Sequence, residues 1–434
     1  MKYETLKSVV LALLVLTSGV LTWSIWTYQP KEEKYFEQMH KVTVSEQNET
    51  PDLIKPLRVL YNTENANYGT VLDSAIQKIV HTMGQWHFQN IKSVRMLNEK
   101  QIRDIISSES QLVITYPDTV PFDLYRGVVQ VETEYPDASF DSIIIDLANT
   151  NEKTTTISFI DRDEGRLYES YVEAEKVDEL KNELTIDQFE IYEIYTMSTG
   201  QQFFLPAEET ELLTIQYLPD VIEPAKFKNA LFSDPSLVRG DSFASGEQYT
   251  DGKSMMKANK STQTLLYINP RQEPDGQWDY EGDEHIIHRS ITFVNEHSGW
   301  TDDYRYFSLG EYQHRTTFRL FYEGRPVFNN SDMAEIRQYW GPEEIYQYQR
   351  PYFKLDVELP NPKKQVLPSG QDALKQLFSY YELELDETQV QDFLIGYSLN
   401  WDKENPDVLV LEPSWYYLYA GSWLKVPMNE KEAS

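Results

Sequence analysis

The feature that most constrains this 434-residue chain is an uninterrupted apolar stretch near its N-terminus, from Ser8 to Tyr28. As a helix that rises about 1.5 Å per residue, this stretch would be roughly 31 Å long, which matches the hydrocarbon core of a bilayer. Lys2 and Lys7 precede it, and aromatic residues gather at its far end, as is typical of membrane-spanning helices. We therefore expect residues 8–28 to form a transmembrane helix. Residues 1–7 would be a cytoplasmic tail, and the rest of the chain would lie outside the cell membrane.

Two other interpretations of the apolar stretch remain open. A cleaved signal peptide has a shorter apolar core, about 7–15 residues, which ends at a site of small residues. The small cluster Thr17–Gly19 instead lies in the middle of the stretch, and apolar residues continue to Trp26. A buried helix of a soluble protein is the third alternative, although such a helix rarely lacks a polar face over this length. The pattern favours an uncleaved signal anchor.

The composition excludes several classes of function. The chain has no cysteine, so it offers no disulfide framework, no thiol nucleophile and no thiolate metal site. Its formal net charge is -31, which repels nucleic acid and anionic membrane surfaces. We therefore expect no nucleic-acid partner, and we interpret the acidic excess as a means of solubility outside the cell.

The pattern of the remaining chain predicts an α+β fold with several domains. A polar stalk is expected at residues 29–52, followed by an N-terminal α+β domain at 53–220, in which residues 70–83 and the segment capped by Asn98 have helical periodicity. A connector helix near residues 224–232 opens a middle α+β domain at 221–359, and a turn-rich linker leads to a C-terminal α+β domain at 360–434. We expect one N-terminal transmembrane helix and a multidomain extracytoplasmic body of mixed, largely antiparallel sheets with flanking helices.

His285 and His288, beside Asp283 and Glu284, form the best candidate metal cluster of the sequence. Helical spacing would place both imidazoles on one face, but residues 288–297 alternate like a strand, which would turn them to opposite faces. No third ligand accompanies them at a spacing typical of zinc sites. We interpret the pair as surface histidines at the edge of a strand, and we predict no metal or cofactor.

Two further segments resemble known sites only in part. Asp161–Gly165 is similar to the start of a calcium loop, but Val172 occupies the position of the bidentate glutamate, so we predict a tight hairpin turn. Gly240–Phe243 resembles the nucleophile block of small serine esterases, but no histidine lies three residues after an aspartate to activate Ser242. We therefore predict no catalytic residue.

The apolar stretch carries a sharper signal for binding to other helices. At about 100° per residue, six residues with a 4-3-4-3-4 spacing fall on one face, and four of them are small. Small residues let helix backbones approach closely in lipid, where no hydrophobic difference drives association. Chance composition is the alternative, because such residues are common in membrane helices. The predicted helix–helix contact residues are Ser8, Ala12, Val15, Gly19, Thr22 and Trp26.

The run KSVVLALLVLTSGVLTWSIWTYQP, together with YEGRPVF, YQRPYFKLDV and PSGQDAL, resembles the YycH family over nearly the whole chain. That family comprises single-span extracytoplasmic auxiliary proteins of the WalK–WalR (YycG–YycF) two-component system, which controls cell-wall metabolism. The resemblance implies a non-enzymatic regulator whose partners are the sensor histidine kinase WalK, the sister protein YycI and the membrane. A homo-oligomer is possible. The family has no catalytic residues to carry over.

A different class of function is a binding module for cell-wall fragments. Exposed indole rings stack well on sugars, and five tryptophans of the body are candidates: Trp300, Trp340, Trp401, Trp415 and Trp423. Burial in a core is the alternative for each ring. Exposure in the folded chain would discriminate between these interpretations.

Overall fold

The computed structural model describes Lys7, residues 16–19, Trp23 and residues 47–131, 134–148, 153–274, 285–310, 314–381 and 385–427. Two compact units result, residues 1–40 and residues 41–434. In the first unit, the described residues are helical and exposed. Over the described residues, no helix combines the length and the apolar character needed to cross a membrane. Most of the predicted transmembrane segment, residues 8–28, lies outside the described residues.

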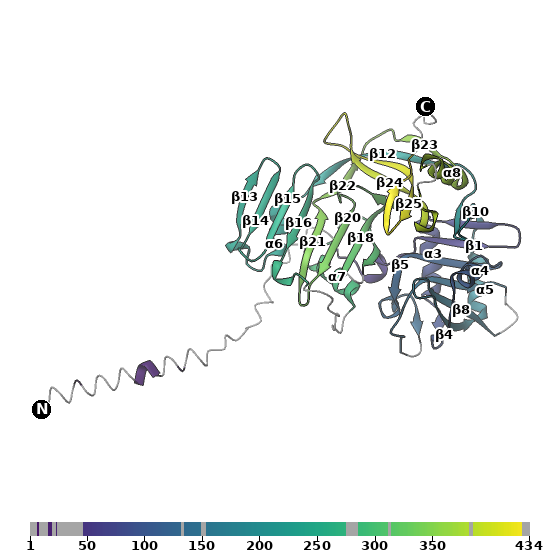
Figure 1. Cartoon of the computed structure of the whole chain (residues 1–434). Coiled ribbons are helices and arrows are strands. Elements are labelled where there is room, and N and C mark those ends of the chain that lie inside the picture. The colour runs from purple at the N-terminus through teal and green to yellow at the C-terminus, as the bar shows by residue number, and fades with distance from the viewer. Residues whose placement is uncertain are drawn as a thin grey trace. The chain divides into compact units, whose positions relative to one another are not determined.

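The first sheet of the body contains nine strands among the described residues, and every neighbouring pair is antiparallel. It occupies the purple and blue part of Figure 1. Helices α3 (Asp73–Met83) and α5 (Ala174–Glu183) contribute to the core on one face, and α4 (Glu99–Ile106) to the core on the other. In spatial order the strands are β11 (Gln202–Pro206), β10 (Glu190–Thr196), β2 (Asn67–Thr70), β1 (Arg58–Asn62), β5 (Gln111–Pro121), β7 (Ser139–Asp146), β8 (Thr154–Asp161), β9 (Arg166–Glu173) and β4 (Lys92–Met96).

Burial on both faces explains why the central strands of this sheet are continuous apolar runs. In β7, Ile143 and Ile145 belong to one core cluster and Ile144 to the other. Successive side chains of a strand point to opposite faces, so a strand covered on both sides needs apolar residues at every position. The predicted helices at α3 and α4 are confirmed, and the Asn98 side chain accepts a hydrogen bond from the backbone N–H of Gln101 as the N-cap of α4. The sequence pattern gave no sign of α5.

The second sheet contains fifteen strands among the described residues and runs from teal to yellow in Figure 1. Its neighbours are antiparallel except for the pair β19–β24. The main path is β13 (Arg239–Phe243), β14 (Gly246–Thr250), β15 (Met255–Asn259), β16 (Thr264–Ile268), β21 (Ile345–Pro351), β20 (Glu335–Trp340), β18 (Arg315–Tyr322), β19 (Arg325–Phe328), β24 (Val390–Trp401), β25 (Leu409–Tyr419), β12 (Thr210–Val221) and β22 (Phe353–Glu358). Off this path, β17 (Tyr304–Gly310) pairs with β18, β23 (Lys363–Leu367) with β12, and β26 (Ser422–Lys425) with β25.

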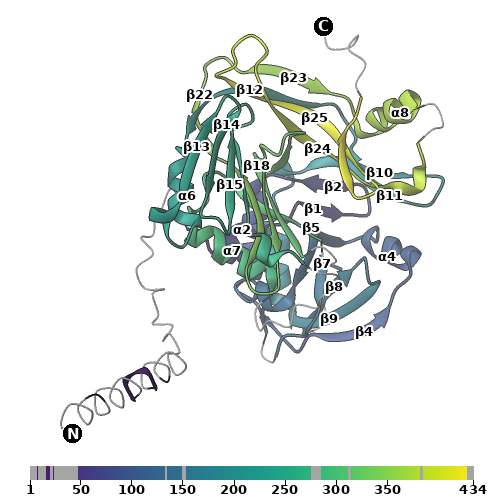
Figure 2. The ribbon, with the colours of Figure 1, turned by 60° about the vertical axis from the view of Figure 1, so that its left-hand side comes forward.

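Four helices accompany the second sheet and its entry: α2 (Thr50–Leu53), α6 (Pro224–Leu231), α7 (Ile286–Glu296) and α8 (Gly370–Tyr381). A short parallel pair, β3 (His87–Phe88) with β6 (Gln130–Val131), completes the body. Phe203 and Leu205 of β11 join the core cluster of α8, β24 and β25, so the first sheet shares a core with the second. The α+β class with largely antiparallel sheets is therefore confirmed, and Figure 2 shows both sheets in one body.

One predicted strand is wrong. Residues 288–297, which alternate like a strand in the sequence, lie in helix α7. Ile287, Ile291 and Val294 of α7 are buried, and their spacing of four and three residues defines one face of a helix. The segment is rich in β-branched and aromatic residues, which favour strands locally, but packing of this apolar face against the sheet outweighs the local preference.

The predicted domain limits at residues 220 and 359 stay a prediction. Strand β12, which ends at Val221, pairs with β22, β23 and β25 of the second sheet. The predicted turn at Asp161–Gly165 is confirmed as the hairpin between β8 and β9. In this turn the Asp161 carboxylate accepts a hydrogen bond from the backbone N–H of Glu164, and Gly165 has a φ of +63°.

Candidate functional sites: the stalk joint and the inter-sheet cleft

The predicted helix–helix contact face can be placed at one residue only. Gly19 is helical and exposed, and a Cβ built there would meet no atom within 4 Å. Ser8, Ala12, Val15, Thr22 and Trp26 lie outside the described residues. The face from Ser8 to Trp26 therefore stays a prediction.

A hydrogen-bonded joint fixes the chain where it enters the body. The Asn295 side chain in α7 accepts a hydrogen bond from the backbone N–H of Asn48 at 3.1 Å and donates one to the Asn48 carbonyl at 2.9 Å. The same Asn295 oxygen accepts a hydrogen bond from Trp300 Nε1 at 2.8 Å, and Gln47 donates to the Asn295 backbone carbonyl at 3.2 Å. We call Gln47, Asn48 and Asn295 the stalk joint, and Figures 1 and 2 place α2 beside α7 at this point.

The chain that follows the stalk joint is anchored in the core. Glu49 and Asp52 form a capping box at the start of α2, and Leu53 at its end is completely buried. These residues lie just before β1 in the sequence. The chain therefore first contacts α7, which accompanies the second sheet, and then continues into β1 of the first sheet.

Arg305 of β17 forms a second contact between the part of the body that contains the first sheet and the part that contains the second sheet. Its guanidinium group donates to both carboxylate oxygens of Asp73, at 2.8 and 2.5 Å, and also pairs with Asp303. Asp73 begins α3, while the Arg305 side chain is only 2% exposed and lies over the Phe321 ring. Buried pairs of this kind need such complete hydrogen bonding to offset the cost of desolvation.

A cleft of about 1190 Å³ lies between the two sheets. On the side of the first sheet it is lined by α4, the end of β5, the β8–β9 turn and β11. On the side of the second sheet it is lined by β17, β18, β20, β24 and β26. Ligand pockets usually measure about 300–1000 Å³, so this cleft suits an extended ligand better than a single small molecule.

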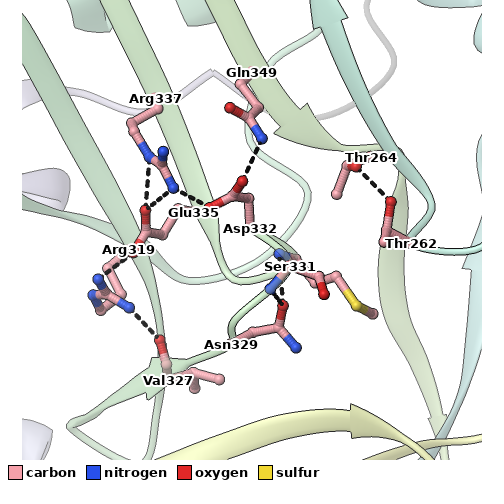
Figure 3. Close-up of polar contacts among 11 residues, drawn as sticks. Thr262, Thr264, Arg319, Val327, Asn329, Ser331, Asp332, Glu335, Arg337 and Gln349 are labelled. Carbon is pink, nitrogen blue, oxygen red and sulfur yellow. Dashed lines mark hydrogen bonds and ion pairs between the residues drawn. The ribbon is translucent and has the colours of Figure 1, made fainter. Parts of the chain in front are cut away.

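Alternation along β18 places three polar side chains of the cleft on one face of the strand. Arg315, Thr317 and Arg319 are two residues apart, and Thr317 and Arg319 lie opposite Arg337 and Glu335 of β20. Figure 3 shows the resulting chain of contacts: Arg319 pairs with Glu335, and Arg337 pairs with Glu335 and Asp332. These charged groups form one wall of the cleft.

The surroundings of Arg319 and Glu335 fix their charges. The Arg319 guanidinium lies 4.4 Å from the ring centroids of both Phe307 and Phe328, and it donates to the Val327 carbonyl at 2.9 Å. Burial alone would raise the pKa of Glu335, but the charges of Arg319 and Arg337 outweigh burial and lower it. Glu335 therefore remains a carboxylate that holds the two guanidinium groups in place.

The five candidate tryptophans differ in how far their rings are exposed in the structure. Trp300, Trp340 and Trp415 are buried, with exposures of 3%, 3% and 0%. Trp401 is half-buried and packs near Phe353, with ring centroids 6.4 Å apart. Trp423 of β26 is half-buried and lines the cleft. Among the five, Trp423 is therefore the candidate for contact with a ligand.

The predicted strand-edge histidine pair is wrong in its local structure. His285 is the N-cap of α7, where its ring nitrogen accepts a hydrogen bond from the backbone N–H of Ile287 at 3.2 Å. Burial lowers the pKa of His285. Asp283 and Glu284 lie outside the described residues, and within the described part of the chain no three His, Asp or Glu side chains are grouped as metal ligands.

The esterase-like block lies at the edge of the second sheet. Ser242 is exposed in β13, and its backbone lies opposite Glu247 of β14. The residues that the sequence pattern did not single out are Asn295 and the charged residues of β18 and β20. Polar residues at alternate positions of the segment RTTFRLFY, namely Arg315, Thr317 and Arg319, were the available signal for the latter.

Two family models match this chain, one in its N-terminal part and one in its C-terminal part. Residues 4–188 match the family described as YycH protein, N-terminal domain, and residues 200–433 match that described as YycH protein, C-terminal domain. A relative from Bacillus subtilis (strain 168) is named two-component system WalR/WalK regulatory protein YycH. It is 26% identical over 439 residues, which cover 96% of this chain and 94% of the relative.

A solved structure has the same fold. The crystal structure of YycH from Bacillus subtilis matches with a TM-score of 0.72 and 19% sequence identity, over 89% of this chain and 99% of that chain. The two family matches together extend over nearly all of the sequence, and the resemblance in the N-terminal run KSVVLALLVLTSGVLTWSIWTYQP and in the carboxyl-side motifs agrees with them. The chain belongs to the YycH family.

Proposed function

We propose that this protein is a membrane-anchored extracytoplasmic regulator of the cell-wall-controlling sensor histidine kinase WalK (YycG). It acts without enzymatic chemistry, through its transmembrane helix and its body, in contact with the kinase and YycI. The observation that carries the proposal is the match of 96% of the chain to a relative named as a regulatory protein of the WalR/WalK system. The apolar stretch at residues 8–28 supports the membrane anchor.

In this proposal the small-residue face from Ser8 to Thr22 packs against helices of the kinase and YycI, and the body biases that packing. A body outside the membrane can bias a helix only through the chain that connects them. The stalk joint supports such a connection, because Asn295 holds the backbone of Asn48 at the start of the body. A signal at the body shifts the kinase only if it favours one helix packing over another.

Crosslinking in membranes tests the helix contact directly. Single cysteines at Ala12 and Gly19 would lie on the predicted contact face, and one at Leu14 on the opposite face. Since the chain has no cysteine, each crosslink reports the introduced residue. We expect crosslinks to the kinase or YycI from Ala12 and Gly19 and few from Leu14. Equal crosslinking from all three positions would contradict a defined contact face.

The alternative function, a binding module for cell-wall fragments, has one structural observation in its favour. The Trp423 ring lines the cleft, 5.5 Å from the Phe328 ring between centroids. If this alternative holds, purified peptidoglycan should retain the protein and Trp423→Ala should reduce the retention. Loss of every partner on removal of the anchor would instead support the regulator.

A further inference from the structure

The two sides of the inter-sheet cleft carry opposite net charge. Among the described lining residues of the first sheet and its helix, Glu99, Asp118, Asp141 and Asp163 outnumber Arg103 and Arg162. Among those of the second sheet, Arg315, Arg319, Arg337 and Lys425 outnumber Glu335 and Asp392. The cleft as a whole is thus balanced, in a chain whose net charge is -31. This balance distinguishes it from the generally acidic surface.

Most of these charged groups have partners within the protein. Arg103 pairs with Glu99, Arg162 with Asp141, Arg319 and Arg337 with Glu335, Asp392 with Arg58, and Lys425 with Glu412. Three groups differ from the rest, because Asp118, Asp163 and Arg315 line the cleft and form no ion pair with any residue that the structure describes. Of these three, Asp118 and Arg315 lie beside strand β17.

Asp118 is a carboxylate held in place by backbone groups. It accepts hydrogen bonds from the backbone N–H of Leu309 and of Thr119, each at 2.7 Å. Burial, together with the nearby carboxylates Asp163 and Asp141, raises its pKa to about 6, although the two backbone hydrogen bonds act in the opposite direction. A cation beside Asp118 would relieve this unfavourable environment.

Arg315 is the matching unpaired cation. Its Nε is buried and has no hydrogen-bond partner among the described residues, a state that costs free energy unless an acceptor is supplied. Arg315 lies opposite Gly310 in the β17–β18 pair. Its Nε is 3.5 Å from the position that a Cβ at Gly310 would occupy.

Asp118 and Arg315 are therefore close to each other along β17. Asp118 contacts Leu309, and Arg315 lies beside the next residue, Gly310. Leu309 and Gly310 are adjacent residues of β17, and an extended peptide of three residues spans about 10 Å. Side-chain amides of the cleft suit a peptide backbone, because each both donates and accepts hydrogen bonds. They include Gln202, Asn330 and Asn400.

We propose that the inter-sheet cleft binds a short peptide that carries both a free ammonium group and a free carboxylate. Asp118 binds the ammonium group and Arg315 binds the carboxylate. The proposal goes beyond the proposed function, since it concerns the body alone and holds whichever partner the anchor contacts.

Calorimetric titration of the full-length protein in detergent with three peptides tests this site. Trialanine carries both charges, N-acetyl-trialanine only the carboxylate, and trialanine amide only the ammonium group. We expect trialanine to bind about 10- to 100-fold more tightly than either blocked peptide, as for the loss of one charged hydrogen-bonding group. No binding of trialanine, or equal affinity for trialanine and either blocked peptide, would overturn the proposal.

Two variants assign the two ends of the peptide. Asp118→Asn keeps an oxygen for the Leu309 N–H and should bind trialanine and N-acetyl-trialanine equally. Arg315→Gln should bind trialanine and trialanine amide equally. Matched controls are Arg239→Gln and Asp241→Asn in the exposed strand β13, which change the same charges away from the cleft and should bind as the wild type does. The reverse pattern, with the controls weakened and the cleft variants unchanged, would show non-specific charge effects only.

Discussion

Asn295 holds the backbone of Asn48 by both of its polar groups, since the side-chain oxygen of Asn295 accepts from the Asn48 N–H and the side-chain nitrogen donates to the Asn48 carbonyl. The two residues are 247 positions apart in the sequence. Helix α7, which follows in the second half of the sequence, therefore holds the backbone at the start of the body. It contacts the described segment at residues 47 and 48, where the chain enters the body.

Replacement of Asn295 by alanine should release the stalk joint. The change removes the bonds to Asn48 and leaves the buried Trp300 Nε1 without its acceptor, so we expect a loss of about 2–3 kcal/mol in the free energy of unfolding. Hydrogen exchange at residues 47–49 should become faster. Asn295→Asp is the comparison variant: it retains the accepting oxygen for Asn48 and Trp300 but turns a carboxylate oxygen toward the Asn48 carbonyl, so it should be less stable than the wild type and still hold the Asn48 N–H. Unchanged exchange at Asn48 in the alanine variant would contradict this account.

A bulky residue at position 19 should disturb partners rather than the protein itself. Because a Cβ at Gly19 meets no atom within 4 Å, Gly19→Leu should leave the thermal unfolding of the body unchanged. It should reduce co-purification with the kinase and YycI and alter kinase output, since leucine prevents close approach of helices. Leu14→Ile on the opposite face serves as the control. Normal co-purification and output with Gly19→Leu would count against the helix contact.

The ion pair between Arg305 and Asp73, which joins the two sheet-containing parts of the body, should contribute strongly to the free energy of unfolding. Asp73→Ala removes a partner from a guanidinium group that is 2% exposed, so we expect destabilisation of about 3 kcal/mol. The exposed pair of Lys375 and Asp372 in α8 offers a comparison. Lys375→Ala should change the free energy of unfolding by less than about 0.5 kcal/mol. The free energy of unfolding of both variants can be measured by denaturant unfolding. Equal losses for Asp73→Ala and Lys375→Ala would contradict a role for burial.

Stability should depend on pH through buried carboxyl groups. Burial raises the pKa of Asp302 to about 6, although hydrogen bonds and the charges of Arg350 and Lys354 act in the opposite direction. The folded state therefore binds more protons than the unfolded state between about pH 4 and 6, and the free energy of unfolding falls as pH rises through this window. For Asp302, a rise of about two pKa units corresponds to a change of about 3 kcal/mol.

The variant Asp302→Asn isolates this contribution, because asparagine does not titrate. The melting temperature of the wild type, relative to that of the variant, should be higher at pH 4.5 than at pH 7.5. His285 and His297, whose pKa values are lowered by burial, oppose the effect by losing stability as pH falls, but both are present in wild type and variant. A constant difference in melting temperature between the two proteins across this range would exclude the titration of Asp302.

Local signals in the sequence determined much of the fold. The cap at Asn98, the periodicity of α3 and the aspartate-glycine turn at Asp161–Gly165 each depend on neighbouring residues only, and each is present where the pattern predicts it. The apolar run at residues 8–28 and the short carboxyl-side motifs were likewise sufficient to indicate the family. These features are encoded over a few residues, so no long-range contact is needed to specify them.

Only the tertiary structure decided the sites. Helix α7 has a strand-like composition, and its contact with the sheet overrides that preference. Asn295 meets Asn48, and Asp118 meets Leu309, across separations of 247 and 191 residues. Pairing over such distances depends on how sheets and helices pack, and no short stretch of sequence carries that information. Asp118 of β5 and Arg315 of β18 likewise come to lie beside adjacent residues of β17 only through the pairing of these strands.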